Sequence, residues 1–159
     1  MANSATNPTD NVVIKLREPN TFQTDQTGSN DFNLGDMVYM DTSAHQVKPL
    51  INSDANAATF AGIAMNGTSV NVYGTKKYFD LVPILEEGNV RLFTTTGDTY
   101  HDGDAVYVGA DAQTITNTAG GLTKKLGYVK LPAGITSIAG GSGITVEINI
   151  TPLWPVTIG

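Results

Sequence analysis

The sequence Gly35-Asp36-Met37-Val38-Tyr39 returns at an offset of 68 residues, from 35 to 103, as Gly103-Asp104-Ala105-Val106-Tyr107. Each copy leads into a polar turn. The similarity continues downstream, because Gly62-Ile63-Ala64 and Gly127-Tyr128-Val129 each lie inside a strand-like run. This repeated order predicts a duplicated β unit.

The start of each copy has a physical reason. Glycine adopts backbone angles that other residues resist, and aspartate can accept hydrogen bonds from the amides of its own turn. The valine and tyrosine that follow enter a strand on opposite faces. We therefore interpret four residues as structural turns, with contact to a metal or ligand as the lesser alternative: Gly35, Asp36, Gly103 and Asp104.

Short strand-like runs separated by turn residues continue along the chain. The last run is the clearest, because apolar and polar residues alternate over 144–150 and give one dry face and one wet face. Helix is expected only near 56–60. The pattern predicts an all-β fold in which the duplicated unit builds a barrel or a sandwich; the family resemblance described below favours a small β-barrel. Its strands are expected at 37–41, 61–65, 70–73, 78–85, 90–94, 105–108, 114–116, 126–131 and 144–150.

The ends of the chain differ from its middle. Residues 1–33 are mostly polar and are expected to form an extended N-terminal arm, 34–151 the β-barrel domain, and 152–159 a C-terminal tail. An isolated apolar run makes the arm a candidate docking segment, formed by Val12, Val13, Ile14, Lys15 and Leu16. The tail is expected either to fold back on the barrel or to contact a neighbouring subunit through Leu153, Trp154 and Val156.

Composition limits the classes of function. The net charge is −6 and the nine basic residues are scattered, so we expect no direct binding to nucleic acid. The chain has no cysteine, which excludes a disulfide, a thiol nucleophile and a Cys-ligated metal. No window has the roughly 20 apolar residues of a membrane span, and the N-terminus lacks the apolar core of a signal peptide, so synthesis in a cytoplasm is expected.

No catalytic, cofactor-binding or metal-binding residues are predicted. The two histidines, His45 and His101, each lie in a polar turn without a partner at ligand spacing. The densest acidic cluster comprises Asp98, Asp102 and Asp104; its spacing fits a solvated turn better than a calcium loop. An enzyme would need converging ionisable groups that the sequence does not offer, so we expect a non-enzymatic protein.

The duplicated Gly-Asp-x-Val-Tyr units, the later runs 60–64 and 126–129, and the closing alternating strand resemble the bacteriophage capsid decoration family. Its members, also called cement or head-stabilising proteins, have a small barrel termed a β-tulip. The resemblance implies a homotrimer on the outer surface of the virion that clamps neighbouring subunits of the major capsid protein. It implies no cofactor. The long polar N-terminal segment and the apolar tail depart from the family pattern, which leaves the mode of attachment open.

Two readings of the binding role remain. The apolar run of the arm can add a strand to the edge of a sheet in the capsid protein, with affinity supplied by main-chain hydrogen bonds. The alternative is a virion-surface module for glycans or a receptor, such as a head fibre or tail-associated β protein. That module would use aromatic stacking platforms, for which the candidates are Tyr73, Tyr78, Tyr100 and Trp154.

Overall fold

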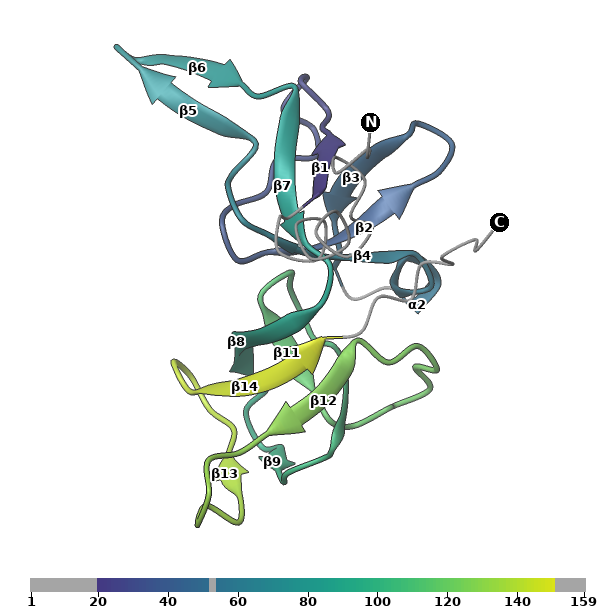
Figure 1. The fold of residues 1–159 in the computed structure, drawn as a ribbon, viewed down its shortest axis with the longest axis vertical. Helices are drawn as coiled ribbons and strands as arrows, with labels where there is room; N and C mark the ends of the chain where they lie inside the picture. Colours follow the sequence, from purple (N-terminus) through teal and green to yellow (C-terminus); the bar gives the residue numbers. More distant parts are fainter. Residues whose placement is uncertain (1–19, 52–53, 151–159) are drawn as a thin grey trace, which may run out of the picture.

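The computed structural model describes residues 20–51 and 54–150, and they fold into two β units (Figure 1). The first unit is a five-stranded sheet with the order β1-β7-β4-β2-β3. Its strands are β1 (Asn20–Gln23), β2 (Met37–Asp41), β3 (Gln46–Pro49), β4 (Phe60–Ala64) and β7 (Leu81–Leu85). It also carries the short helix α2 (Asp54–Ala57) and a separate hairpin of β5 (Ser69–Val72) and β6 (Thr75–Tyr78).

The second unit is a closed barrel with the order β10-β11-β8-β14-β12. Its strands are β8 (Gly88–Thr94), β10 (Ala105–Val108), β11 (Thr114–Thr116), β12 (Gly127–Lys130) and β14 (Thr145–Ile150). Two short strands, β9 (Thr99–Tyr100) and β13 (Ile138–Ala139), pair with each other beside it. The prediction of an all-β protein with a small barrel is confirmed.

The two units share one topology. Starting from the first strand of each unit, the order β1-β7-β4-β2-β3 corresponds to β8-β14-β12-β10-β11. In the second unit β11 and β8 pair in parallel and close the barrel. In the first unit a single parallel bridge, between Thr24 and Val47, joins the equivalent positions. The duplication read from the sequence is therefore also a duplication of strand order and direction.

The repeated Gly-Asp turn uses the same hydrogen bonds in both units. The backbone N–H of Gly35 donates to the carbonyl of Ala64 at 2.8 Å, and that of Gly103 to Val129 at 2.9 Å. The carboxylate Oδ2 of each aspartate accepts the N–H three residues before it, at 2.8 Å for Asp36 and 2.7 Å for Asp104. These bonds fix the turn that sends the chain into β2 or β10.

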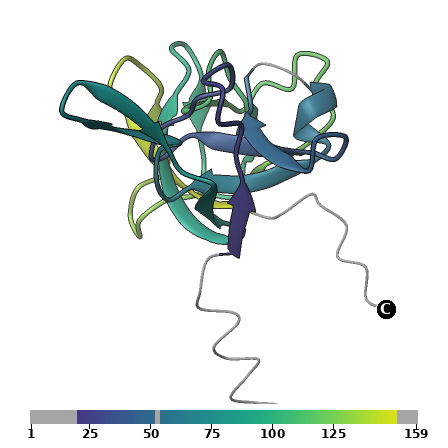
Figure 2. The ribbon, with the colours of Figure 1, turned by 90° about the horizontal axis from the view of Figure 1, so that it is seen from above.

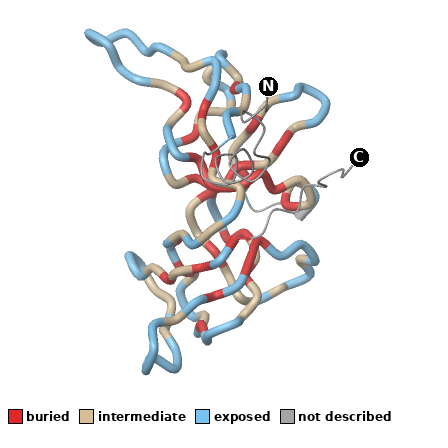
Figure 3. The backbone as a smooth tube through the Cα atoms, viewed as in Figure 1, coloured by how far each residue is buried: buried red, intermediate tan, exposed pale blue. Residues whose placement is uncertain are grey.

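The interior explains why the units stay together (Figure 3). One hydrophobic cluster runs across both units, with Met37 and Phe60 from the first and Val106 and Ile148 from the second. A smaller cluster lies within the first unit around Val82 and Ile84. Burial of apolar side chains is the main favourable contribution to the free energy of folding. Separating the two units would expose the shared cluster to water, which would cost free energy.

Polar contacts cross the same junction. The N–H of Met37 donates to the carbonyl of Ala112 at 2.6 Å, and the side-chain amide of Gln113 donates to Asp36 Oδ1 at 2.5 Å. Asp36 therefore closes its own turn with one carboxylate oxygen and holds the second unit with the other. One turn residue of the duplicated motif thus also joins the two units.

The structure differs from the expected division of the chain. Residues 20–33 are not an extended arm: β1 pairs with β7 from Asn20 to Gln23, and Phe32 is buried. The expected single barrel of 34–151 is instead two units, because each copy of the repeat completes its own sheet. Helix occurs at Asp54–Ala57, slightly before the expected place. The docking segment Val12–Leu16 and the tail residues Leu153, Trp154 and Val156 lie outside the described residues.

Candidate attachment hairpin

The β5–β6 hairpin stands away from both units (Figures 1 and 2). Its strands pair from Ser69 opposite Tyr78 to Val72 opposite Thr75, leaving a two-residue turn of Tyr73 and Gly74. Both turn residues have positive φ, 49° and 79°. Two positive φ angles in succession define a type I′ turn, whose twist matches that of the flanking strands.

Tyr73 does not suit the position it occupies. The first central residue of a type I′ turn is usually Asn, Asp or Gly, because a bulky side chain at positive φ is strained. Tyr73 is also fully exposed, so its ring packs against none of the residues that the structure describes. A residue that breaks a local rule without a gain in packing marks a functional position. Tyr73 is therefore the leading candidate for a binding residue.

One face of the hairpin is fastened to the body of the first unit. Lys76 forms an ion pair with Asp31, which raises the pKa of the lysine, and its Nζ lies 5.3 Å from the centroid of the Tyr78 ring. Thr68 is buried at the base of the hairpin. Its carbonyl accepts a hydrogen bond from the N–H of Phe79 at 2.9 Å, and its own N–H donates to the carbonyl of Phe32 at 3.0 Å. These contacts hold the hairpin in a defined direction.

The opposite face of the hairpin is apolar and carries positive charge. Val70 lies opposite Lys77, Val72 lies opposite Thr75, and all four side chains are exposed. Residues 69–78 contain two lysines and no carboxylate, whereas the whole chain carries −6. We call Val70, Val72, Tyr73, Thr75 and Lys77 the tip face. An exposed apolar patch with a rim of charge is typical of a protein interaction site.

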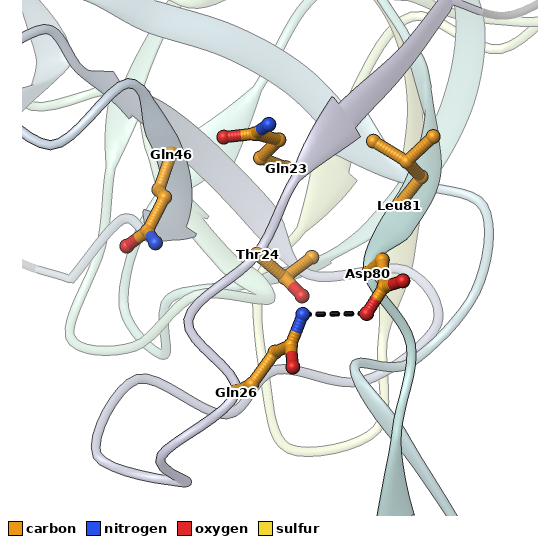
Figure 4. Close-up of a pocket in the computed structure, with 6 residues that line it drawn as sticks. All are labelled: Gln23, Thr24, Gln26, Gln46, Asp80 and Leu81. Atoms are coloured by element: carbon orange, nitrogen blue, oxygen red, sulfur yellow. Dashed lines mark hydrogen bonds between the residues drawn. The ribbon is translucent and has the colours of Figure 1, made fainter.

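The end of β1 and the strand β3 of the first unit are joined by the single bridge between Thr24 and Val47, and we call this place the seam. A polar hollow lies beside it (Figure 4). It has a volume of about 420 Å³ and is lined by Gln23, Thr24, Gln26, Gln46, Asp80 and Leu81. The amide of Gln26 donates to Asp80 at 2.5 Å, and the Thr24 hydroxyl donates to the Phe79 carbonyl at 2.5 Å. Its remaining amide groups can both donate and accept hydrogen bonds.

A second hollow lies at the junction between the units. It has a volume of about 450 Å³ and is lined by Asp36, Ile51, Phe93, Asp111, Ala112 and Gln113. Ile51 is 55% exposed and Phe93 is 41% exposed, which is unusual for large apolar side chains in a concave place. Asp111 is also exposed. We call this feature the junction hollow; it combines apolar walls with a negative rim.

The acidic cluster expected in the second unit is used for loop structure. Asp98 Oδ2 accepts from the Thr116 hydroxyl at 2.6 Å and from the N–H of Asn117 at 3.2 Å. Asp102 accepts the N–H of Leu131 at 2.8 Å. Burial opposes ionisation of Asp104, yet hydrogen bonds from His101 and Asn117 outweigh it and lower its pKa. Each carboxylate already has partners, which favours the solvated-turn interpretation over a calcium site.

Within residues 20–51 and 54–150 no group of three or more His, Asp or Glu side chains is placed to hold a metal ion. His45 is exposed at a tight turn with φ 56°. His101 Nδ1 lies 3.4 Å from Asp104 Oδ2, inside the repeated turn. In the same part of the chain, no helix has the length and apolar character needed to cross a bilayer.

The predicted aromatic platforms do not form one surface. Tyr100 is fully buried, and burial raises its pKa to about 12. Its hydroxyl donates to the Ile115 carbonyl at 2.8 Å. Tyr78 belongs to the fastened face of the hairpin, and Trp154 is outside the described residues. Of the candidates that the structure describes, Tyr73 is the one that is displayed, and it lies in a turn instead of ending the strand expected at 70–73.

Comparisons of the chain with models of protein families and with curated proteins found no match.

Proposed function

We propose that the protein decorates a bacteriophage capsid. In this proposal it binds the outer surface of the assembled head as a homotrimer and clamps neighbouring subunits of the major capsid protein. The observation that carries the proposal is the hairpin: a fixed projection that ends in Tyr73, strained and fully exposed, beside two exposed valines. The resemblance of the duplicated Gly-Asp units to decoration proteins supplies the identity of the partner.

The physics of a clamp agrees with this arrangement. A clamp needs a rigid body, here supported by a hydrophobic cluster common to both units, and a displayed anchor. Aromatic residues are favoured as anchors because they bury a large area with few rotatable bonds. Many modest contacts repeated by symmetry then act together, so that the loss of one anchor in every copy greatly weakens occupancy.

Co-sedimentation with expanded, empty capsids tests the proposal. The wild-type protein is expected to sediment with the capsids, and Tyr73→Asn to lose at least about tenfold in occupancy, since one good anchor contributes 1.4 kcal/mol or more. The matched control is Tyr128→Thr, which removes a half-exposed tyrosine from β12 in the second unit and is expected to keep normal occupancy. Absence of the wild-type protein from the pellet would reject decoration.

The N-terminal docking segment, Val12–Leu16, remains part of the proposal. Deletion of residues 1–33 is unsuitable as a test, because it removes β1 and the buried Phe32 and so damages the first unit. Deletion of residues 1–19 keeps every described strand. We expect this shorter deletion to leave the thermal unfolding midpoint unchanged and to reduce capsid occupancy; full occupancy would eliminate the segment as a docking element.

The polar hollow supports a second candidate function, binding of a glycan or receptor on a host surface. Three glutamine side chains and Asp80 offer donors and acceptors suited to sugar hydroxyls, and Leu81 adds an apolar edge. No aromatic platform is among its lining residues. A glycan array is the direct measurement: binding that Gln46→Ala abolishes supports this function, and a clean negative beside strong capsid binding leaves decoration alone.

A further inference from the structure

We propose that the tip face of one copy docks into the junction hollow of a second copy, and that this contact builds the oligomer. The inference rests on the proposed function in one respect, that the hairpin is an attachment element. The new element is the surface to which the hairpin attaches, the junction hollow of a second copy. The two features are the exposed tip face, Val70 to Lys77, and the hollow walled by Ile51 and Phe93.

A single chain cannot fill its own hollow with its own hairpin. Figure 1 shows β5 and β6 projecting from the end of the first unit that lies farthest from the second unit. The junction hollow lies between the units, lined by Asp36 and Ile51 from the first and by Phe93 and Asp111 from the second. The hairpin is held in its direction by Lys76 on Asp31 and by buried Thr68. A hairpin that enters this hollow therefore belongs to another copy.

The apolar parts of the two surfaces match. Tyr73 and Val72 are the outermost apolar residues of the hairpin, and Ile51 and Phe93 are the exposed apolar walls of the hollow. The hollow is open to solvent and has a volume of about 450 Å³, which leaves room for a side chain to enter from outside. An aromatic ring on an aromatic wall in a desolvated pocket is the usual composition of an interface hot spot.

Charge favours a second copy over other partners of the same shape. The hairpin carries +2 from Lys76 and Lys77, so the remainder of the chain carries −8. Lys77 is on the tip face, and Asp111 is on the exposed rim of the hollow. Opposite charges of this kind steer encounter and fix orientation at an interface. The strongly acidic remainder of an identical chain is a complementary surface for the basic hairpin.

The geometry of the contact limits the assembly. Tip face and hollow are different surfaces, so the contact is heterologous and generates a ring when the rotation closes. A closed ring of three agrees with the proposed homotrimer. Since both units line the hollow, each docked hairpin also bridges the two units of its neighbour. The ring therefore stiffens every copy at its internal junction.

Cross-linking with single cysteines tests the contact, because the chain has no cysteine of its own. Thr75→Cys places a thiol on the tip face beside the intact Tyr73, and Ile51→Cys places one in the hollow. A mixture of the two variants treated with a short bis-maleimide is expected to give a covalent dimer. The control is Ile135→Cys, a residue exposed to 48% in another loop, which is expected to give at least about tenfold less.

Light scattering supplies the second measurement. We expect the wild-type mass to be three times 16.7 kDa, and Tyr73→Asn and Lys77→Glu each to shift it toward the monomer. Adding Asp111→Lys to Lys77→Glu is expected to restore the oligomer, which a folding defect in the hairpin would not do. A monomeric wild type, or equal cross-linking to Ile51→Cys and Ile135→Cys, overturns the inference.

The outcomes separate this inference from the proposed function. A monomer that gives no cross-link yet sediments with capsids and loses occupancy on Tyr73→Asn shows that the hairpin binds capsid protein; decoration then stands and self-docking falls. An oligomer with the expected cross-link that does not sediment with capsids upholds self-docking and removes decoration.

Discussion

The two units of the molecule have the same strand order and use it differently. The two units differ in the connection between the last two strands of the repeat, from β4 to β7 in the first and from β12 to β14 in the second. The first connection is the projecting β5–β6 hairpin. The second contains β13, which pairs with β9 and is held against the barrel. Both units thus contain the Gly-Asp turn that directs folding, whereas only the first displays a projecting hairpin.

The closing seams differ in the same way. Phe93 and Thr94 of β8 pair with β11, and the barrel is closed. At the equivalent seam of the first unit, Thr24 and Val47 form the only bridge, and polar Gln23 and Gln46 line a hollow beside it. Thr24 and Thr94 are both buried, and each donates its hydroxyl away from the seam, to the carbonyl of Phe79 just before β7 and to that of Ile144 just before β14. The second unit is thus closed by paired strands, whereas the first unit has one bridge and a polar hollow at the same place.

The largest expected effect tests the common scaffold. A Cβ at Gly62 would collide with the Leu85 carbonyl, and one at Gly127 with the Asn149 carbonyl, the equivalent residue of the other unit. Each Gly→Ala variant is expected to lose about 3 kcal/mol or more of unfolding free energy, because backbone cannot move aside cheaply. Gly62→Ala is expected to lose about 1 kcal/mol beyond Gly127→Ala, since Gly62 has φ 139°. Urea unfolding measures both; near-normal stability of either contradicts the equivalence.

The next largest effect is a difference in unfolding free energy between variants of Asp36 and Asp104, the aspartates of the two copies of the repeat. Asp36 is 7% exposed and accepts hydrogen bonds from Asn33 and Gln113, whereas the Asp104 side chain is 33% exposed. Asp36→Ala is expected to cost about 2–3 kcal/mol and Asp104→Ala about 1 kcal/mol, because the hydrogen bonds to Asp36 are partly buried and one of them joins the two units, whereas the bond from the His101 N–H to Asp104 is exposed. Denaturant unfolding of the pair of variants is the measurement. Equal losses would show that Asp36 does not hold the units together.

A smaller effect is expected from acid. The Lys48 ammonium, 2.6 Å from Asp41, and the Ser43 hydroxyl hold the pKa of Asp41 well below its usual range. A carboxyl with a lowered folded-state pKa stabilises the fold above its ordinary pKa of about 3.9, and this contribution is lost as the pH falls through the folded-state value. The thermal midpoint is expected to fall from pH 5 to pH 2. Asp41→Asn should reduce that slope; an unchanged slope assigns the acid sensitivity elsewhere.

The smallest effect on stability concerns the β5–β6 hairpin, which has no counterpart in the second unit. Tyr73→Asn creates Asn-Gly, the favoured type I′ pair, so the free energy of unfolding is expected to rise by about 0.5 kcal/mol while binding is lost. Thermal unfolding at low protein concentration, where copies do not associate, is the measurement. A clear loss of stability would show that Tyr73 packs within its own chain.

Local sequence predicted the strands whose residues alternate or are apolar. Three segments, Met37–Asp41, Ala105–Val108 and Thr114–Thr116, have the expected bounds, and β14 begins one residue later than expected. Five strands were missed, namely β1, β3, β6, β9 and β13. β1 (Asn20–Gln23) and β3 (Gln46–Pro49) are mostly polar, and Pro49 is tolerated because β3 is the last strand in the sheet order. Such strands form because they complete a sheet, which a local pattern does not record.

The candidate site was only partly visible in the sequence. Tyr73 was named as an aromatic platform, but its exposure follows from the direction of the hairpin, which Asp31 and Thr68 fix from elsewhere in the chain. Ile51, Phe93 and Asp111 had no sequence signal in common. They meet only because the two units pack together at Asp36 and Gln113.

The β class, the duplication and the Gly-Asp turns could be predicted from the sequence, because alternation, glycine angles and aspartate capping act within a few residues. The tertiary structure alone decided that each copy closes its own sheet, that one connection projects and the other is held down, and which residues wall the junction hollow. Those outcomes depend on pairing and burial between segments far apart in the chain, whose free energy no local run of residues contains.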